Sequence, residues 1–139
     1  MNFFAYGSLI FDEVMFAVTG QRYRCVTATL SGFARYCVSG ATYPGLLLAP
    51  DDSVVGVLYT DVSLASFKRL DRFEGEYYQR RSVSVGTDHE TESSAETYVF
   101  HPEFEHLLSR ISWDSENFRL RHLNTFLSSY QGFNWIDSH

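Results

Sequence analysis

One carboxylate in this chain has neighbours that favour proton-transfer chemistry. Glu74 stands beside Leu70 and Phe73, two apolar residues at helical spacing. A carboxyl group held in apolar surroundings has a raised pKa and can act as a general base near neutral pH. A glutamate at a helix C-terminus also opposes the helix macrodipole, which favours a functional reason for it. From spacing alone, a solvated helix end with Asp71 and Glu76 as similar surface acids is the simpler interpretation.

A second candidate is the segment Tyr6, Gly7, Ser8 and Leu9, which directly follows an apolar run. Glycine permits a turn in which successive backbone N–H groups point into a cavity. Such a turn can hold a carboxylate or a developing oxyanion. An ordinary turn at a strand end is the alternative. Ser8 is not predicted to be a nucleophile, because the chain has no GxSxG motif and no His/Asp pair that can be placed beside it.

Tyrosines form a third set of candidates, namely Tyr43, Tyr77, Tyr78 and Tyr98. Most tyrosines fill cores, but one or two of these can direct a hydroxyl group into a pocket. His89, Glu90 and Glu92 lie in a polar stretch, so we interpret them as solvated surface and predict no metal site.

The elements that must position these residues are short and varied. The helix with the clearest site connection spans 64–74, with Ser63 as a possible N-cap and Gly75 as its end. The polar stretch 86–96 is predicted to be a hairpin loop, and 51–53 a turn. The other predicted helices are 12–18, a short one at 104–109, and 115–132. The predicted strands are 2–6, two strands over 22–38 joined by a turn or bulge at Ser31-Gly32, 46–49, 54–60, 77–85 and 96–100.

Many short strands with few helices and no βαβ rhythm predict an α+β fold. The chain has 139 residues, which predicts a single domain over 1–139. Twelve Phe, nine Tyr and two Trp need an enclosed face, which favours a closed or nearly closed barrel.

The charge balance excludes several partners. The formal net charge is −6 and Lys68 is the single lysine, which argues against nucleic-acid binding. The longest uncharged run, 36–50, is too short and too broken by Gly and Pro to span a bilayer, so no membrane partner is predicted. Cys25 and Cys37 cannot form a disulfide framework and are predicted to be reduced thiols in the cytoplasm.

Several motifs together are more specific than any one residue. The motifs are FAYGSL at 4–9, LSGFARY at 30–36, TYPGLL at 42–47, VVGVLYTDV at 54–62, LDRFEGEYYQRRSVSV at 70–85, ETYVF at 96–100 and WDSENFRLRHLNTFL at 113–127. Their order resembles that of the γ-glutamylcyclotransferase-like superfamily, and the chain most resembles the branch named after plant avirulence-induced-gene proteins.

The resemblance implies a small mixed β-barrel flanked by helices, with a cavity at its mouth. It implies that Tyr6, Gly7, Ser8 and Leu9 form the substrate-binding loop, that Glu74 matches the family's catalytic glutamate, and that Tyr78 lines the same cavity. The implied reaction cyclises a γ-glutamyl amine or amide to 5-oxoproline and needs no cofactor. The γ-glutamylamine branch continues its first motif with a Lys-Gly-type extension, whereas this chain has Ile10-Phe11-Asp12 there.

The predicted partner is therefore a small γ-glutamyl molecule, and the sequence carries no prediction of an oligomeric state. The alternative is a non-catalytic module on the same scaffold that binds a small carboxylate or a peptide end. Release of 5-oxoproline from γ-glutamyl compounds separates the two hypotheses.

Overall fold

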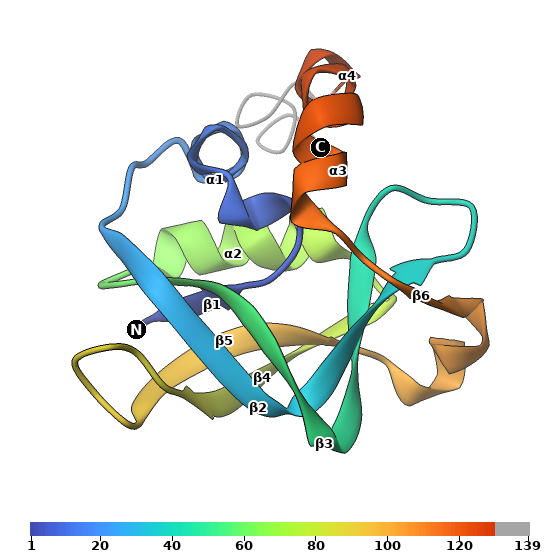
Figure 1. The fold of residues 1–139 in the computed structure, drawn as a ribbon. Helices are drawn as coiled ribbons and strands as arrows, with labels where there is room; N and C mark the ends of the chain where they lie inside the picture. Colours follow the sequence, from blue (N-terminus) through green and yellow to red (C-terminus); the bar gives the residue numbers. More distant parts are fainter. Residues whose placement is uncertain (130–139) are drawn as a thin grey trace.

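The computed structural model describes residues 1–129 of the chain (Figure 1). Its strands form one sheet in the order β4-β5-β1-β3-β2-β6. The strands are β1 (Phe3–Ala5), β2 (Cys25–Val38), β3 (Pro44–Tyr59), β4 (Tyr78–Val85), β5 (Ser93–Phe100) and β6 (Leu108–Ser112). The helices are α1 (Asp12–Thr19), α2 (Leu64–Glu74), α3 (Ser115–Arg121) and α4 (Leu123–Ser129), with 3₁₀ turns η1 (Ser8–Ile10) and η2 (Pro102–Leu107).

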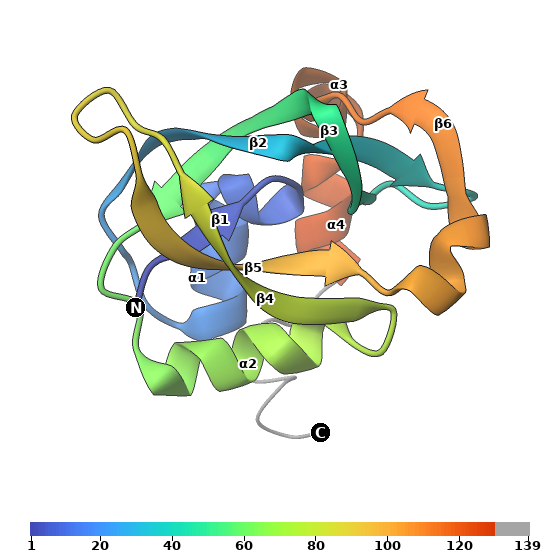
Figure 2. The same ribbon diagram turned by 90° about the horizontal axis from the view of Figure 1, so that it is seen from below.

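The sheet is mixed and curls into a half-barrel flanked by helices. Strand β1 pairs with β3 in antiparallel fashion and with β5 in parallel fashion. The backbone groups of Thr29 and Gly86 exchange two hydrogen bonds of 2.9 Å, which join β2 to the chain just after β4. Figure 2 shows the curled strands with α2 along one side. The predicted α+β class and helix-flanked barrel are confirmed in this curled form.

The two long strands bend together at one bulge. Phe33 pairs with Leu48 and Ser31 pairs with Ser53, so the four residues 49–52 of β3 face Gly32 alone. Gly32 has φ +88°, which an L side chain rarely adopts. The predicted bulge is confirmed, but the two strands predicted over 22–38 are one continuous strand, and the predicted break of β3 at 51–53 is wrong. The bulge accommodates Pro50 and the turn-forming residues after it, so the strand continues.

Helix α2 has the predicted bounds because its caps are local. The Ser63 hydroxyl oxygen accepts a hydrogen bond from the Ser66 N–H at 3.1 Å. At the other end Gly75 has φ +75°, and its N–H donates to the Asp71 carbonyl at 3.2 Å. Phe67 and Leu70 are buried against the sheet. These features fix where the helix ends and therefore where Glu74 lies.

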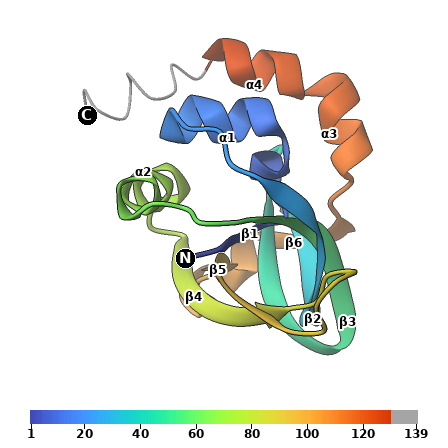
Figure 3. The same ribbon diagram turned by 90° about the vertical axis from the view of Figure 1, so that its left-hand side faces the viewer.

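The predicted helix over 115–132 is two helices. The chain departs from helical geometry at His122, where φ is −126°, and α4 then takes a new direction alongside α1 (Figure 3). Phe118 packs on Phe11 with ring centroids 5.7 Å apart, while Phe126 contacts Phe73 at 6.1 Å. We attribute the bend to these two contacts, because Phe11 lies directly before α1 whereas Phe73 lies on α2. Residues 130–132 of the prediction lie outside the described part.

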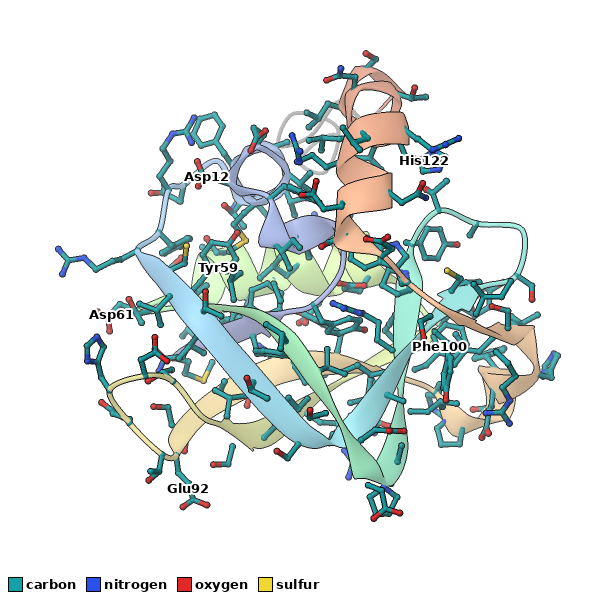
Figure 4. All side chains as sticks on the ribbon, viewed as in Figure 1. Asp12, Tyr59, Asp61, Glu92, Phe100 and His122 are labelled. Atoms are coloured by element: carbon teal, nitrogen blue, oxygen red, sulfur yellow. The ribbon has the colours of Figure 1, made fainter. Side chains whose placement is uncertain are left out.

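The core has two parts, and β1 contributes to both. Successive residues of a strand face opposite sides of the sheet. Phe3 therefore packs between the sheet and the helices with Phe67 and Phe118, whereas Phe4 packs inside the curled sheet with Leu58. At the far end of the molecule Glu92 lies in the β4–β5 loop, away from α1, α3 and α4 (Figure 4).

Some short elements differ from prediction. The segment 104–109, predicted to be a helix, forms the end of the 3₁₀ turn η2 and the start of β6. Strand β6 has no counterpart among the predicted elements, and the turn expected around Gly7 and Ser8 takes the form of the 3₁₀ turn η1. Across residues 1–129, no helix has the length and apolar character needed to cross a membrane.

Candidate active site

A cavity of about 230 Å³ opens where the end of β1, the end of α2 and the turn before β3 meet. All six residues singled out from the sequence line it: Tyr6, Gly7, Ser8, Leu9, Glu74 and Tyr78. The remaining lining residues are Phe3, Phe4, Ala5, Tyr43, Pro44, Phe73, Tyr77, Tyr98 and Phe126. Most of this wall is apolar or aromatic. The structure thus brings the predicted residues together, while their chemical roles stay predictions.

Glu74 contributes the carboxyl group in this cavity. As a residue it is half-buried, because it borders the open space, but its carboxyl group is surrounded by protein. Burial raises the pKa of Glu74 to about 8, and the nearby charge of Asp71 adds to the shift. No residue from 1 to 129 forms a hydrogen bond or an ion pair with this carboxylate. The group can therefore gain and lose a proton near neutral pH.

Asp71, one helical turn earlier, has a different environment. Its Oδ1 accepts a hydrogen bond from the Tyr98 hydroxyl at 2.6 Å and lies 3.4 Å from Nε of Arg80. Arg80 Nε also lies 3.8 Å from a carboxylate oxygen of Glu96. We call Asp71, Arg80, Glu96 and Tyr98 the polar network. It satisfies the Asp71 carboxylate, while the Tyr98 ring forms part of the cavity wall.

The loop Tyr6–Leu9 is held from three directions. Arg35 Nη1 donates to the Tyr6 carbonyl at 2.8 Å, and the Tyr59 hydroxyl donates to the Leu9 carbonyl at 2.7 Å. The Tyr6 hydroxyl donates to the Tyr98 carbonyl at 2.5 Å. These bonds fix both ends of the loop.

Gly7, Ser8 and Leu9 of the loop line the cavity. The N–H group of Ile10 donates to the Gly7 carbonyl at 3.0 Å. It is the first N–H group after β1 that has a backbone acceptor among residues 1–129. A Cβ atom on Gly7 would lie 2.9 Å from Cδ of Pro44, so only glycine fits against this proline. That the N–H groups of Gly7, Ser8 and Leu9 hold an anionic ligand stays a prediction from the sequence.

Tyr78 lines the opposite wall, and its hydroxyl donates to the Pro44 carbonyl at 2.7 Å. Burial raises its pKa, so the phenol stays neutral. Its ring packs edge-on against Phe100 at 5.2 Å. Tyr43, Tyr77 and Tyr98 line the cavity too, as the prediction for the tyrosines allowed.

Sequence reasoning missed the residues that support the loop. Arg35 lies within the LSGFARY motif, but its acceptor on Tyr6 is 29 positions away. Tyr59 is 50 positions from Leu9. No spacing rule connects such partners, because β2 and β3 bring them together. Within residues 1–129, no three His, Cys, Asp or Glu side chains form a group that could hold a metal ion.

Comparison with known proteins gives a consistent picture. The family model described as gamma-glutamyl cyclotransferase, AIG2-like, matches residues 3–119. AIG2-like protein D of Arabidopsis thaliana is 31% identical over 132 residues, which cover 94% of this chain and 86% of that protein. AIG2-like protein C of Arabidopsis thaliana is 32% identical over 133 residues, which cover 95% of this chain and 77% of that protein.

Solved structures share the fold. The solution structure of At3g28950.1 from Arabidopsis thaliana has a TM-score of 0.71 and 30% identity, and the match covers 94% of this chain and 79% of that one. A structure named gamma-glutamyl cyclotransferase has a TM-score of 0.58 and 21% identity over 73% of this chain and 66% of its own. The second likeness concerns the fold alone.

Proposed function

The chain belongs to the gamma-glutamyl cyclotransferase, AIG2-like family, and from this premise we propose that it is a γ-glutamylcyclotransferase acting on a γ-glutamyl amine or amide. The products are 5-oxoproline and the free amine. The observation that supports the proposal is the Glu74 carboxyl group, without a partner among residues 1–129, in the same cavity as the backbone donors of Gly7–Leu9. A base and an anion-binding loop are the two parts that this reaction needs.

The reaction is an internal acyl transfer. The α-amine nitrogen of the substrate attacks its own γ-carbonyl carbon, a new C–N bond closes the five-membered ring, and the old amide C–N bond breaks. Glu74 takes the proton that the α-ammonium group must lose, and then returns a proton to the leaving nitrogen. A carboxyl group with a pKa of about 8 can serve both steps near neutral pH. No electron is transferred, so no redox partner is required.

The cavity wall supplies orientation. The N–H groups of Gly7, Ser8 and Leu9 hold the substrate carboxylate or the oxyanion; one such donor is typically worth roughly 3 to 4 kcal/mol. Tyr78 and the rings around it confine a flexible chain in the folded geometry that ring closure requires. Intramolecular closures oriented in this way reach effective molarities of roughly 10⁵ to 10⁸ M. The apolar wall also keeps water from competing with the amine.

The first test replaces Glu74 by glutamine. We expect Glu74→Gln to keep the fold and to reduce 5-oxoproline release by roughly 10²- to 10⁴-fold, because the amide cannot accept the proton. Release is measured by chromatography from a panel of γ-glutamyl amines, γ-glutamyl dipeptides and glutathione. The matched control is Glu76→Gln, which makes the same change at an exposed acid two residues away and should retain turnover.

Full activity of Glu74→Gln would contradict the assignment of the base. Silence of the wild-type protein across the whole panel would instead favour a module that binds a small carboxylate without turning it over. We further expect the protein to work in the cytoplasm, which the two free thiols of Cys25 and Cys37 support.

A further inference from the structure

The cavity wall supplies no positive charge from a side chain. Its fifteen described lining residues include neither Lys nor Arg, and the formal net charge of the chain is −6. The proposed substrate carries a carboxylate, and ring closure creates a developing oxyanion. An anion that leaves water needs a hydrogen-bonded or charged partner to offset its lost hydration. Arg35 is a cation that contacts the Tyr6–Leu9 loop from outside the cavity lining.

The guanidinium group of Arg35 is held by groups from three other parts of the chain. Its Nη1 donates to the Tyr6 carbonyl at 2.8 Å and to the Val55 carbonyl at 3.2 Å. Its Cζ lies 5.3 Å from the ring centroid of Trp113, whose indole N–H donates to the Thr42 carbonyl at 2.8 Å. The side chain is half-buried. These contacts fix the place of its positive charge beside the loop.

Arg35 keeps this charge. Burial lowers its pKa, but the charge of Asp114 acts in the opposite direction, and an arginine side chain does not lose its proton in proteins. Within residues 1–129, Arg35 forms no ion pair. The Asp114 carboxylate instead caps α3, where its Oδ1 accepts from the N–H groups of Glu116 and Asn117 at 2.9 Å and 3.4 Å. The guanidinium charge therefore acts on the carbonyl groups that it contacts.

The bond to the Tyr6 carbonyl also acts on the N–H group of Gly7, because the two groups belong to one peptide unit. A peptide unit is planar, and in its trans form the C=O and the N–H point in opposite directions. None of the described peptide bonds is cis, so the Gly7 N–H points away from Arg35. A charge-assisted hydrogen bond on the carbonyl polarises the unit and strengthens its N–H as a donor. Arg35 thus fixes the direction of this donor and increases its partial positive charge.

We infer that Arg35 is a positioning residue for the proposed reaction, which fixes the Tyr6–Gly7 peptide and supplies through it the positive potential with which the Gly7 N–H holds the substrate anion. The inference rests on the proposed function and names the residue that supports its anion-binding loop. Arg35 itself touches no substrate atom, because it lies outside the cavity lining. This arrangement accounts for an anionic substrate in a cavity whose described wall has no cation.

A pair of variants at position 35 tests the role of the charge. We expect Arg35→Gln to lower kcat/KM for 5-oxoproline release by about tenfold or more, because a weakened and misdirected donor stabilises the anion less. Arg35→Lys should recover most of this loss. Both carbonyls accept from the single nitrogen Nη1, and a lysine ammonium group also offers several donors on one charged nitrogen.

Arg110→Gln is the matched control. Arg110 also lies over an aromatic ring, at 5.6 Å from the centroid of Tyr36, but it is exposed and outside the cavity lining. This variant should keep kcat/KM. Wild-type kcat/KM in Arg35→Gln, or equal losses in Arg35→Gln and Arg35→Lys, would overturn the inference and leave the cyclotransferase activity standing.

A titration followed by nuclear magnetic resonance tests the Gly7 donor without turnover. We expect the amide resonance of Gly7 in the wild-type protein to shift when 5-oxoproline, which carries a carboxylate, is added. Arg35→Gln should need a several-fold higher concentration for half of that shift. A Gly7 resonance that does not move in the wild-type protein would overturn the inference even if Arg35→Gln does not fold, and so would equal half-shift concentrations in the two proteins.

The two proposals can fail separately. If no γ-glutamyl compound of the panel yields 5-oxoproline with the wild-type protein, the proposed function fails. The titration then still decides whether Arg35 strengthens the Gly7 donor toward a carboxylate.

Discussion

Asp71 and Glu74 are one turn apart on α2, yet they belong to two different regions of the molecule. Asp71 belongs to the polar network, where its Oδ1 accepts a hydrogen bond from the Tyr98 hydroxyl and lies 3.4 Å from Nε of Arg80. Glu74 faces the cavity, where burial and the Asp71 charge raise its pKa to about 8. Within residues 1–129, the same side-chain chemistry is satisfied in one region and left without a partner in the other. The difference shows that partners, rather than residue type, decide which carboxylate can exchange a proton.

The largest expected effect concerns stability at alkaline pH. The pKa of Glu74 rises from an ordinary 4.5 to about 8 on folding, so the folded state holds this proton more tightly than the unfolded state. Its contribution to stability is fully present below about pH 4.5 and is lost as pH rises through about 8. Glu74→Gln cannot ionise. We therefore expect it to be more stable than the wild-type protein at pH 9, on the order of 3 kcal/mol, and similar to it at pH 4.

Denaturant unfolding at pH 4, 7 and 9 measures this effect. Glu76→Gln is the matched control, because Glu76 is an exposed acid two residues from Glu74 and its replacement should bring no alkaline gain. If the free energies of unfolding of Glu74→Gln and the wild-type protein change with pH in the same way, then burial in the cavity does not raise the pKa of Glu74.

A smaller effect is expected where Gly7 packs against Pro44 in the cavity wall. Gly7→Ala places a Cβ atom 2.9 Å and 3.0 Å from Cδ and Cγ of Pro44. We expect a loss of roughly 1 to 3 kcal/mol in stability from this overpacking. We also expect a clear fall in kcat/KM for 5-oxoproline release, because Pro44 lies in the cavity wall and Tyr78 binds its carbonyl.

Gly40→Ala is the control for Gly7→Ala. Gly40 has φ +75° and open space around its Cα, so alanine there strains the backbone outside the cavity lining. Its variant should lose stability and keep kcat/KM. Equal loss of kcat/KM in both variants would show that the fit of Gly7 against Pro44 is not special to the site.

The smallest effect links the two regions. Asp71→Asn removes the charge that is the second cause of the raised pKa of Glu74, while burial, the larger cause, remains. We expect the rise of kcat/KM with pH to move to lower pH, so that activity at pH 6 increases by about threefold. A pH profile unchanged from that of the wild-type protein would show that the polar network does not influence the cavity.

Local signals in the sequence were sufficient for several elements. The stripe of apolar residues between Ser63 and Gly75 predicted α2 with its bounds. The polar run 86–96 predicted the β4–β5 hairpin, but β5 begins at Ser93, inside that run. Capping and turn formation depend on residues within a few positions, which is why the sequence contains them. The motifs around Tyr6 and Glu74 likewise identified residues that share one cavity.

Other features depend on contacts between distant positions and escaped prediction. The polar run at 51–53 predicts a turn, but pairing with β2 keeps β3 continuous through it. Strand β6 has a short polar sequence and exists because it pairs with β2 at Tyr36 and Val38. No Gly or Pro lies near His122, so the sequence does not predict the bend there. Each was decided by packing against another element.

The sequence by itself determined the helix that carries Glu74, the turn that follows β1, and the family to which both belong. Only the tertiary structure decided that Asp71 has partners and that Glu74 has none within residues 1–129. The Tyr98 hydroxyl reaches Asp71 across 27 positions, and Arg35 reaches the Tyr6 carbonyl across 29. A pKa depends on the solvent and charges around a group. Those surroundings come from strands far apart in the chain, so they arise only when the sheet curls and the helices close over it.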